Sequence, residues 1–187
     1  GDSGKCLATA FSPKEEMKIL SVKPGWAEQE PEDWWLNLRS AIHECNSQLG
    51  PLSREIGAVG ISYQMHGLVI IDKNGSVLRP SIIWCDSRAV SYGEKAFNAL
   101  GSEFILSHML NSPGNFTASK LAWVKENEPE VYAKAKHVLL PKDYIRYKLT
   151  GGYAMDKADG AGTVLFDLKA RDWSSEILAV LGIDASW

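Results

Sequence analysis

Cysteine is scarce in this sequence, and the few cysteines form no recognisable set. Cys6, Cys45 and Cys85 are odd in number and far apart, which fits neither a disulfide framework nor a Cys-x-x-Cys metal site. The four histidines also lack the spacing of metal ligands. The sequence therefore predicts a protein of a reducing compartment, the cytoplasm, in which no metal is held by protein ligands alone.

Long hydrophobic runs and an excess of basic charge are absent as well. No apolar stretch approaches the ~20 residues that a membrane helix requires, and no signal peptide is visible. The net charge is −3 and the lysines and arginines are scattered, so the sequence shows no basic surface of the kind that binds nucleic acid. We expect neither a membrane nor a nucleic acid among the partners.

Three familiar catalytic and nucleotide-binding motifs are also missing. The sequence contains no GxxxxGK[ST] phosphate loop, no GxGxxG after a strand and no GxSxG nucleophile elbow. If the protein uses a nucleotide, other residues must bind its phosphates.

What is present is the composition of one globular domain. The chain has 187 residues, of which 45% are hydrophobic and 23% are charged, enough to bury a core and too apolar to favour disorder. Short apolar runs alternate with helical patterns, which predicts an α/β architecture. The predicted strands are Lys5–Phe11, Ile56–Ser62, Leu68–Asp72, Val77–Leu78, Ser81–Trp84 and Val138–Leu140, with a hairpin turn at Asn74–Gly75.

Proline, glycine and acidic residues mark the ends of the predicted helices. The first helix begins at Pro31, where proline and the acids after it suit the first turn, and it ends before Gly50. We expect Asp172 to cap the last helix and the small polar residues of Asp156–Thr163 to form a loop. The other predicted helices are Ala89–Leu100, the SKLAWVKEN segment, a short helix from Pro129, and Lys142–Leu149 with a Gly151-Gly152 cap.

The segment Gln64-Met65-His66-Gly67 interrupts two predicted strands. It follows a buried strand, where open α/β sheets place ligand contacts. The amide and the imidazole can donate and accept hydrogen bonds, Met65 offers an apolar wall, and Gly67 permits a close approach of backbone. These residue types suit a polyhydroxylated ligand. The competing interpretation is an ordinary turn with His66 hydrogen-bonded and Met65 in the core.

Other polar residues stand at strand ends and helix starts, and each has two interpretations. Asp86 and Arg88, in the Trp84–Arg88 segment, either orient a ligand or form a network with each other and with backbone. Asn115 either faces a pocket or is an ordinary helix-entry residue. The carboxylates of Asp143, Asp156 and Asp159 either have a functional role or serve capping and turn formation, which explain them equally well.

Several stretches, in this order and at compatible spacing, resemble the FGGY family of carbohydrate kinases. They are WAEQEPEDWW, then IGAVGISYQMHGLVIIDKNGSVLRPSIIWCDSR, then FTASKLAWVKENEPEVYAKAKHVLLPKDYIRYKLTGGYAMDKADGAGTVLFD with RDWSSEIL. The QMHG segment is similar to the xylulose kinases of this family, whereas the glycerol kinases carry an Arg-Glu pair there. The resemblance covers essentially the whole chain.

The resemblance implies an actin-like, ribonuclease H-like domain with a mixed sheet flanked by helices. Residues 1–187 would form most of the N-terminal, sugar-binding domain, and the second, nucleotide-binding domain is not in this sequence. We expect the domain to be incomplete at its N-terminus, because chains of the family begin with two strands that carry an Asp-x-Gly-(Thr/Ser) turn. Without them Lys5–Phe11 has no partner and Ile56–Ser62 has an exposed edge, so we expect these residues not to fold alone.

The implied activity is the ATP-dependent phosphorylation of a ketopentose, D-xylulose to D-xylulose 5-phosphate. By the resemblance Met65 and His66 contact the sugar, Gln64 lies beside them and Asn115 lines the same pocket. Asp86 and Arg88 are expected to support the site. The catalytic base would be an aspartate beyond Trp187, so no residue here is assigned that role.

The implied partners are small molecules. ATP, with Mg²⁺ carried on the nucleotide, would bind mainly outside this segment, and a homodimer is an expectation at the level of the family. Two alternatives stay open: an FGGY kinase for another ketose or polyol, and a sugar-binding fragment that has no kinase activity in isolation.

Overall fold

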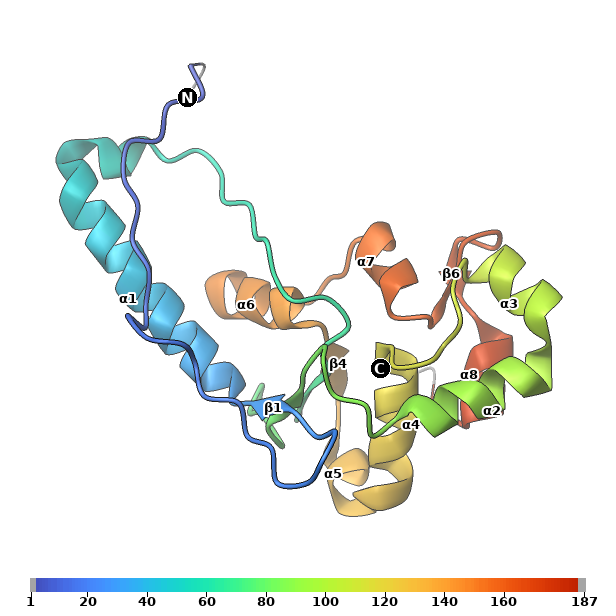
Figure 1. Ribbon diagram of the computed structural model, residues 1–187. Coiled ribbons are helices and arrows are strands. Elements are labelled where there is room, and N and C mark those ends of the chain that lie inside the picture. The colour runs from blue at the N-terminus through green and yellow to red at the C-terminus, as the bar shows by residue number, and fades with distance from the viewer. Residues whose placement is uncertain (1–2, 185–187) are drawn as a thin grey trace.

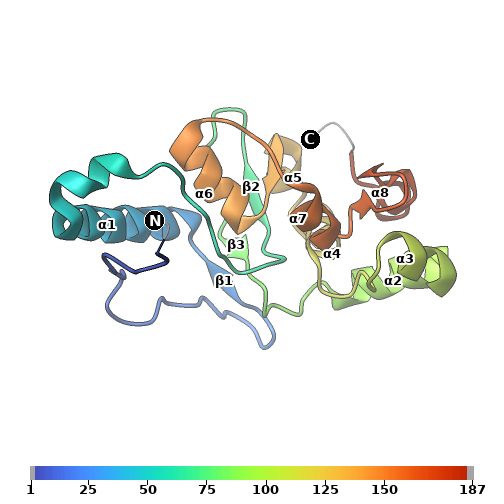
Figure 2. The ribbon, with the colours of Figure 1, turned by 90° about the horizontal axis from the view of Figure 1, so that it is seen from above.

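Short strands in the middle of the molecule separate two groups of helices (Figures 1 and 2). The computed structural model describes residues 3–184. Its helices are α1 (Pro31–Leu49), α2 (Val90–Leu100), α3 (Ser102–His108), α4 (Thr117–Asn127), α5 (Pro129–Lys134), α6 (Pro141–Thr150), α7 (Lys157–Gly162) and α8 (Ser175–Leu181), with a 3-10 helix, η1, at Gly50–Glu55. Its strands are β1 (Glu28–Gln29), β2 (Val69–Ile71), β3 (Ser81–Ile82), β4 (His137–Leu139), β5 (Phe166–Asp167) and β6 (Asp172–Trp173).

The strand β2 lies at the centre of the molecule. It pairs with β4, with Ile70 opposite Val138, and Leu68, just before it, forms a bridge with Ile82 of β3. β3 pairs in turn with β1, and β5 pairs separately with β6. All the strand pairs that the structure describes are antiparallel.

The residues around β2 supply both hydrophobic clusters of the core. Leu68 and Ile70 pack in one cluster with α3, α4 and α8, and Val69 and Ile71 pack in the other with α6 and α1. Successive side chains of a strand point to opposite faces, so four consecutive apolar residues serve two layers of helices. Figure 2 shows α1 and α6 on one side of β2 and β3, and α2, α4 and α8 on the other.

Two predicted strands are not found, and a third, Val77–Leu78, is reduced to a single bridge between Val77 and Ile71. Lys5–Phe11 and Ile56–Ser62 run extended but pair with no strand among the described residues. An extended segment becomes a strand only when a second backbone satisfies its N–H and C=O groups. In the first segment a side chain does part of this work, because the amide of Gln48 in α1 bonds both backbone groups of Thr9.

Two further corrections concern the C-terminal third of the chain. The predicted loop Asp156–Thr163 contains the helix α7, whose cap is Asp156, with its carboxylate accepting from the N–H of Asp159 at 3.0 Å. Asp172 does not cap the last helix, because it pairs in β6. The cap of α8 is Ser174 instead, with its hydroxyl accepting from the N–H of Ile177. The short helix α3 was not predicted.

Candidate functional site

Three loops bring the candidate residues together. Gln64–Gly67 runs directly into Leu68 and β2, Trp84–Arg88 follows β3, and Asn115 stands before α4. Leu68 and Ile82 form an antiparallel bridge. The loop that enters β2 and the loop that leaves β3 therefore lie at the same end of these neighbouring strands. Tertiary contacts of each residue then decide which side chains remain available to a ligand.

Gln64 links two of these loops. Its carbonyl Oε1 accepts from the backbone N–H of Trp84 at 3.3 Å, and its Nε2 donates to Oε1 of Gln29 in β1 at 3.2 Å. Both ends of the amide are therefore engaged inside the protein, which fixes the loop in its present conformation.

His66 is held in one orientation and one tautomer. Its Nδ1 lies 2.8 Å from the carbonyl oxygen of Gly162. Since a carbonyl only accepts hydrogen bonds, Nδ1 carries the proton, and Nε2 is the acceptor of the neutral ring. The ring also meets Phe116 edge-on, with centroids 4.3 Å apart. Its backbone has φ 64°, a left-handed conformation that side chains other than glycine rarely adopt.

Met65 and Gly67 flank this histidine in different ways. Met65 is 47% exposed, so the interpretation that placed it in the core is wrong. Gly67 approaches α6 closely, because a Cβ at this position would lie 2.6 Å from Cγ of Pro141. The glycine therefore serves close packing of the loop against α6.

Asp86 and Arg88 belong to a buried ionic network. Asp86 is fully buried and its Oδ2 accepts from the N–H of Ala27 at 2.6 Å. Arg88 donates to Asp86 at 2.7 Å and to Glu28 of β1 at 2.6 Å. Its guanidinium lies 3.7 Å from the ring centroid of Trp26, a cation–π arrangement. The two residues fix the loop after β3, and their charged groups are used within the protein.

Asn115 fastens the start of α4 to the same loop. Its Nδ2 donates to the carbonyls of Asp86 and Trp84, the latter at 3.4 Å. Its Oδ1 is buried and has no hydrogen-bond partner among residues 3–184. This oxygen is the one polar atom of the amide that the described residues leave without a partner.

Lys120, in α4, is a site residue that the sequence interpretation missed. It is fully buried, and its ammonium donates to the carbonyl of His66 at 2.8 Å and to that of Ile83 at 3.0 Å. Burial lowers the pKa of Lys120 to about 8, and the charge of Asp86 opposes this shift. A signal was present in the sequence: Lys120 shares a helix face with Val124, where a charged residue is unexpected.

The carboxylates of Asp143, Asp156 and Asp159 surround one lysine, Lys142. The ammonium of Lys142 lies 3.3 Å from Asp143 and 2.5 Å from Asp159, and it also pairs with Asp156. Burial raises the pKa of Asp143, and Lys142 opposes the rise. Residues 3–184 contain no group of three His, Cys, Asp or Glu that could hold a metal ion. The cluster therefore joins α6 to α7.

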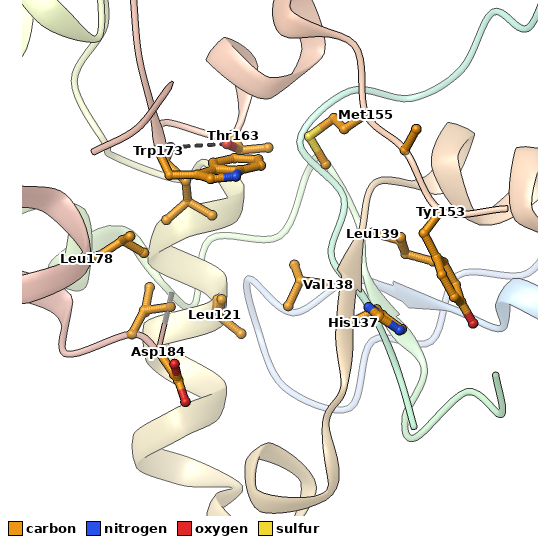
Figure 3. Close-up of a pocket in the computed structure, with 13 residues that line it drawn as sticks. Leu121, His137, Val138, Leu139, Tyr153, Met155, Thr163, Trp173, Leu178 and Asp184 are labelled. Atoms are coloured by element: carbon orange, nitrogen blue, oxygen red, sulfur yellow. Dashed lines mark hydrogen bonds between the residues drawn. The ribbon is translucent and has the colours of Figure 1, made fainter. Parts of the chain in front are cut away.

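A cavity of about 200 Å³ lies elsewhere, between α4, β4 and the C-terminal elements (Figure 3). Its lining is mainly apolar, with Leu121, Val138 and Leu178 facing the space. The hydroxyl of Thr163 is engaged, since it accepts from the N–H of Leu165 at 3.0 Å. None of the six candidate residues lines this cavity, so it does not fit the polyhydroxylated ligand that they suit.

Known proteins resemble this chain along most of its length. A xylulose kinase from Klebsiella pneumoniae is 39% identical over 165 residues, which are 88% of this chain and 34% of that protein. The crystal structure of xylulose kinase from Rhodospirillum rubrum superposes with a TM-score of 0.83 at 28% identity, covering 92% of this chain and 36% of that one. For a gluconate kinase from Lactobacillus acidophilus the TM-score is 0.81 at 28% identity, covering 92% and 35%.

These comparisons set the fold and the extent of the chain. The superpositions confirm the α/β, actin-like fold class. The chain spans about a third of the length of the curated relatives that it matches. In the part of the chain that the structure describes, no helix has the length and apolarity needed to cross a membrane. The N-terminal domain model of the FGGY family of carbohydrate kinases matches residues 5–186, and the chain belongs to that family.

Proposed function

We propose that this chain is most of the sugar-binding N-terminal domain of a kinase that phosphorylates a ketopentose with ATP. The proposed substrate is D-xylulose and the product D-xylulose 5-phosphate. The observation that carries the proposal is the geometry of His66, whose ring is locked by Gly162 and leaves Nε2 as an acceptor. Support for a ketopentose comes from the relatives, since a xylulose kinase is 39% identical to this chain.

The residues of this chain would hold the sugar and leave the chemistry to groups outside it. Phosphoryl transfer asks a protein for alignment and charge stabilisation more than for covalent chemistry. Nε2 of His66 would accept from a sugar hydroxyl, Asn115 would line the same pocket, and Met65 would cover an apolar face of the sugar. Gln64 would fix the loop, and Asp86 with Arg88 would fix its neighbour.

ATP and Mg²⁺ are the proposed co-substrate and metal, and the residues described here do not fit a metal site. No three suitable ligands come together in residues 3–184, and the carboxylates near α7 already share Lys142. We therefore assign no metal ligand within residues 3–184. A cytoplasmic homodimer that takes only small molecules remains part of the proposal.

Replacing His66 by alanine in the full-length protein tests the assignment. We expect kcat/KM for D-xylulose to fall by about 10- to 100-fold, as the loss of one or two hydrogen bonds to substrate would cause, with the KM for ATP unchanged. His43→Ala is the matched control, because His43 is exposed on α1. An unchanged efficiency of His66→Ala would refute the sugar contact.

A second experiment separates the sugars. The gluconate kinase superposes with a TM-score of 0.81, so the fold alone does not select a ketopentose. Initial rates with D-xylulose, D-ribulose, glycerol and gluconate at equal concentrations should be highest for D-xylulose. A higher rate with another sugar or polyol would assign the protein to a different FGGY activity, and no rate with any of them would favour a sugar-binding protein without kinase activity.

A further inference from the structure

Lys120 is a charged side chain in the interior of the molecule. It lies in α4, where all residues from Thr117 to Val124 are buried, and its own exposure is 0%. Removing an ammonium from water is costly unless the protein returns strong interactions. Among residues 3–184 the lysine forms no ion pair, because the nearby Asp86 is engaged by Arg88 and by the N–H of Ala27. The interactions that offset the cost of burying this ammonium are hydrogen bonds to backbone carbonyls.

The two carbonyls that Lys120 binds belong to two different loops of the candidate site. The carbonyl of His66, at 2.8 Å, is in the loop before β2, and that of Ile83, at 3.0 Å, begins the loop after β3. Hydrogen bonds from a charged donor are stronger than neutral ones. One ammonium therefore joins the His66 loop to the Trp84–Arg88 loop from beneath.

The carbonyl of His66 is where such a restraint matters. A non-glycine residue with φ 64° is in a conformation that persists only when its surroundings fix it. Two contacts do so here: Gly162 binds the ring at Nδ1, and Lys120 binds the backbone carbonyl. Without the second, the carbonyl of His66 loses its charged donor, and the contacts of the ring with Gly162 and Phe116 remain.

We propose that Lys120 is a positioning residue for the sugar: its ammonium joins the carbonyls of His66 and Ile83 and so sets the place of the His66 ring. The proposal rests on the proposed function for its kinetic consequence. Its structural consequence, an altered His66 ring, can be measured without any sugar.

The test compares Lys120→Met with Lys125→Met in the full-length protein. Both lysines stand in α4 and donate to a carbonyl, but Lys125 is exposed and its partner is Gly182. With Lys120→Met we expect the KM for the preferred sugar to rise at least 10-fold, with the KM for ATP within twofold of wild type. Lys125→Met should leave both values unchanged. A sugar KM within twofold of wild type, or an equal rise of both KM values, would overturn the proposal.

A spectroscopic measurement separates this proposal from the function on which it rests. In protein labelled with 13C-histidine, the ring signal of His66, assigned through His66→Ala, should shift or broaden in Lys120→Met and remain in place in Lys125→Met. An unmoved signal overturns the positioning role even if the protein phosphorylates no sugar. If Lys120→Met does not fold, Lys120→Arg is measured instead, and its sugar KM should rise at least threefold. A sugar KM equal to wild type in Lys120→Arg would count against the proposal.

Discussion

The ring nitrogen, the ring edge and the backbone carbonyl of His66 each contact a different residue. Gly162 binds the ring nitrogen, Phe116 packs against the ring edge, and Lys120 binds the carbonyl. These partners come from α7, from the residue before α4, and from α4 itself. Catalytic and binding groups work when their supporting contacts hold them within a fraction of an ångström. The histidine therefore depends on two distant segments, α7 and the start of α4, as much as on its own loop.

Gly67 gives a prediction at the scale of one residue. A Cβ there would lie 2.6 Å from Cγ and 3.1 Å from Cδ of Pro141, and a proline ring cannot move aside as a flexible side chain can. We expect Gly67→Ala to destabilise the full-length protein by about 1–3 kcal/mol, the usual cost of overpacking, measured by chemical denaturation.

The matched control for this prediction is Gly57→Ala. A Cβ at Gly57 would have no atom within 4 Å, and neither glycine has a positive φ. The free energy of unfolding should stay near wild type or rise slightly, because alanine restricts the unfolded chain. Equal stability of the two variants would show that Pro141 does not constrain Gly67.

Among the helices, α4 differs from α1 in how much of its surface is covered. α4 is buried on most sides from Thr117 to Val124, whereas in α1 the only buried residue is Pro31. Helix α1 packs along one face against α6, whereas α4 is enclosed by other helices. This enclosure allows Lys120 to reach two loops from inside the molecule.

The start of α8 gives a prediction at the scale of an element. Ser174 is 1% exposed and its hydroxyl accepts from the N–H of Ile177, one of the N–H groups that a helix start leaves unpaired. Ser174→Ala should lower the free energy of unfolding by about 1 kcal/mol. Ser175→Ala, one position later, should have a smaller effect, because among the described residues that hydroxyl donates only to the Glu176 carboxylate. Thermal unfolding of both variants in the full-length protein would decide, and a larger loss for Ser175→Ala would contradict this capping.

At the scale of the whole molecule, the layer that contains α1 and α6 leaves more apolar surface open to solvent than the layer that contains α4. A groove of about 580 Å³ lies between α1, α6 and the extended segment from Ile56 to Gln64. The apolar side chains of the two extended segments are open to solvent: Leu7 by 62%, Phe11 by 66%, Ile56 by 54% and Val59 by 70%. Apolar, extended segments with unpaired backbone favour association between chains.

We therefore predict that residues 1–187 in isolation do not unfold cooperatively. Expressed alone, they should aggregate or bind hydrophobic dyes, and their denaturation should be gradual by circular dichroism. The full-length protein, handled in the same way, serves as the control. A soluble monomer of the isolated residues with one sharp transition would refute this prediction.

Local patterns in the sequence were sufficient for most elements and for the identity of the candidate residues. Pro31 and Pro129 begin helices, Gly151 ends one with a left-handed φ, and the run from Leu68 contains a buried strand, all as predicted. These features depend on backbone angles and periodicity, which are properties of neighbouring residues. The QMHG and WCDSR segments could be selected from residue types and predicted strand ends, and in the structure WCDSR follows β3 whereas QMHG precedes β2.

Tertiary structure decided what the local patterns left open. Lys5–Phe11 and Ile56–Ser62 have the composition of strands, but a strand needs a partner, and none is found among the described residues. Asp172 and Ser174 are both acceptable caps for α8. Asp172 pairs with Asp167 between β6 and β5, and Ser174 caps the helix. The role of Lys120 could not be predicted, because it depends on carbonyls 54 and 37 residues away in the chain. Residue type limits what a side chain can bind, and only the folded chain brings the partner within hydrogen-bond distance.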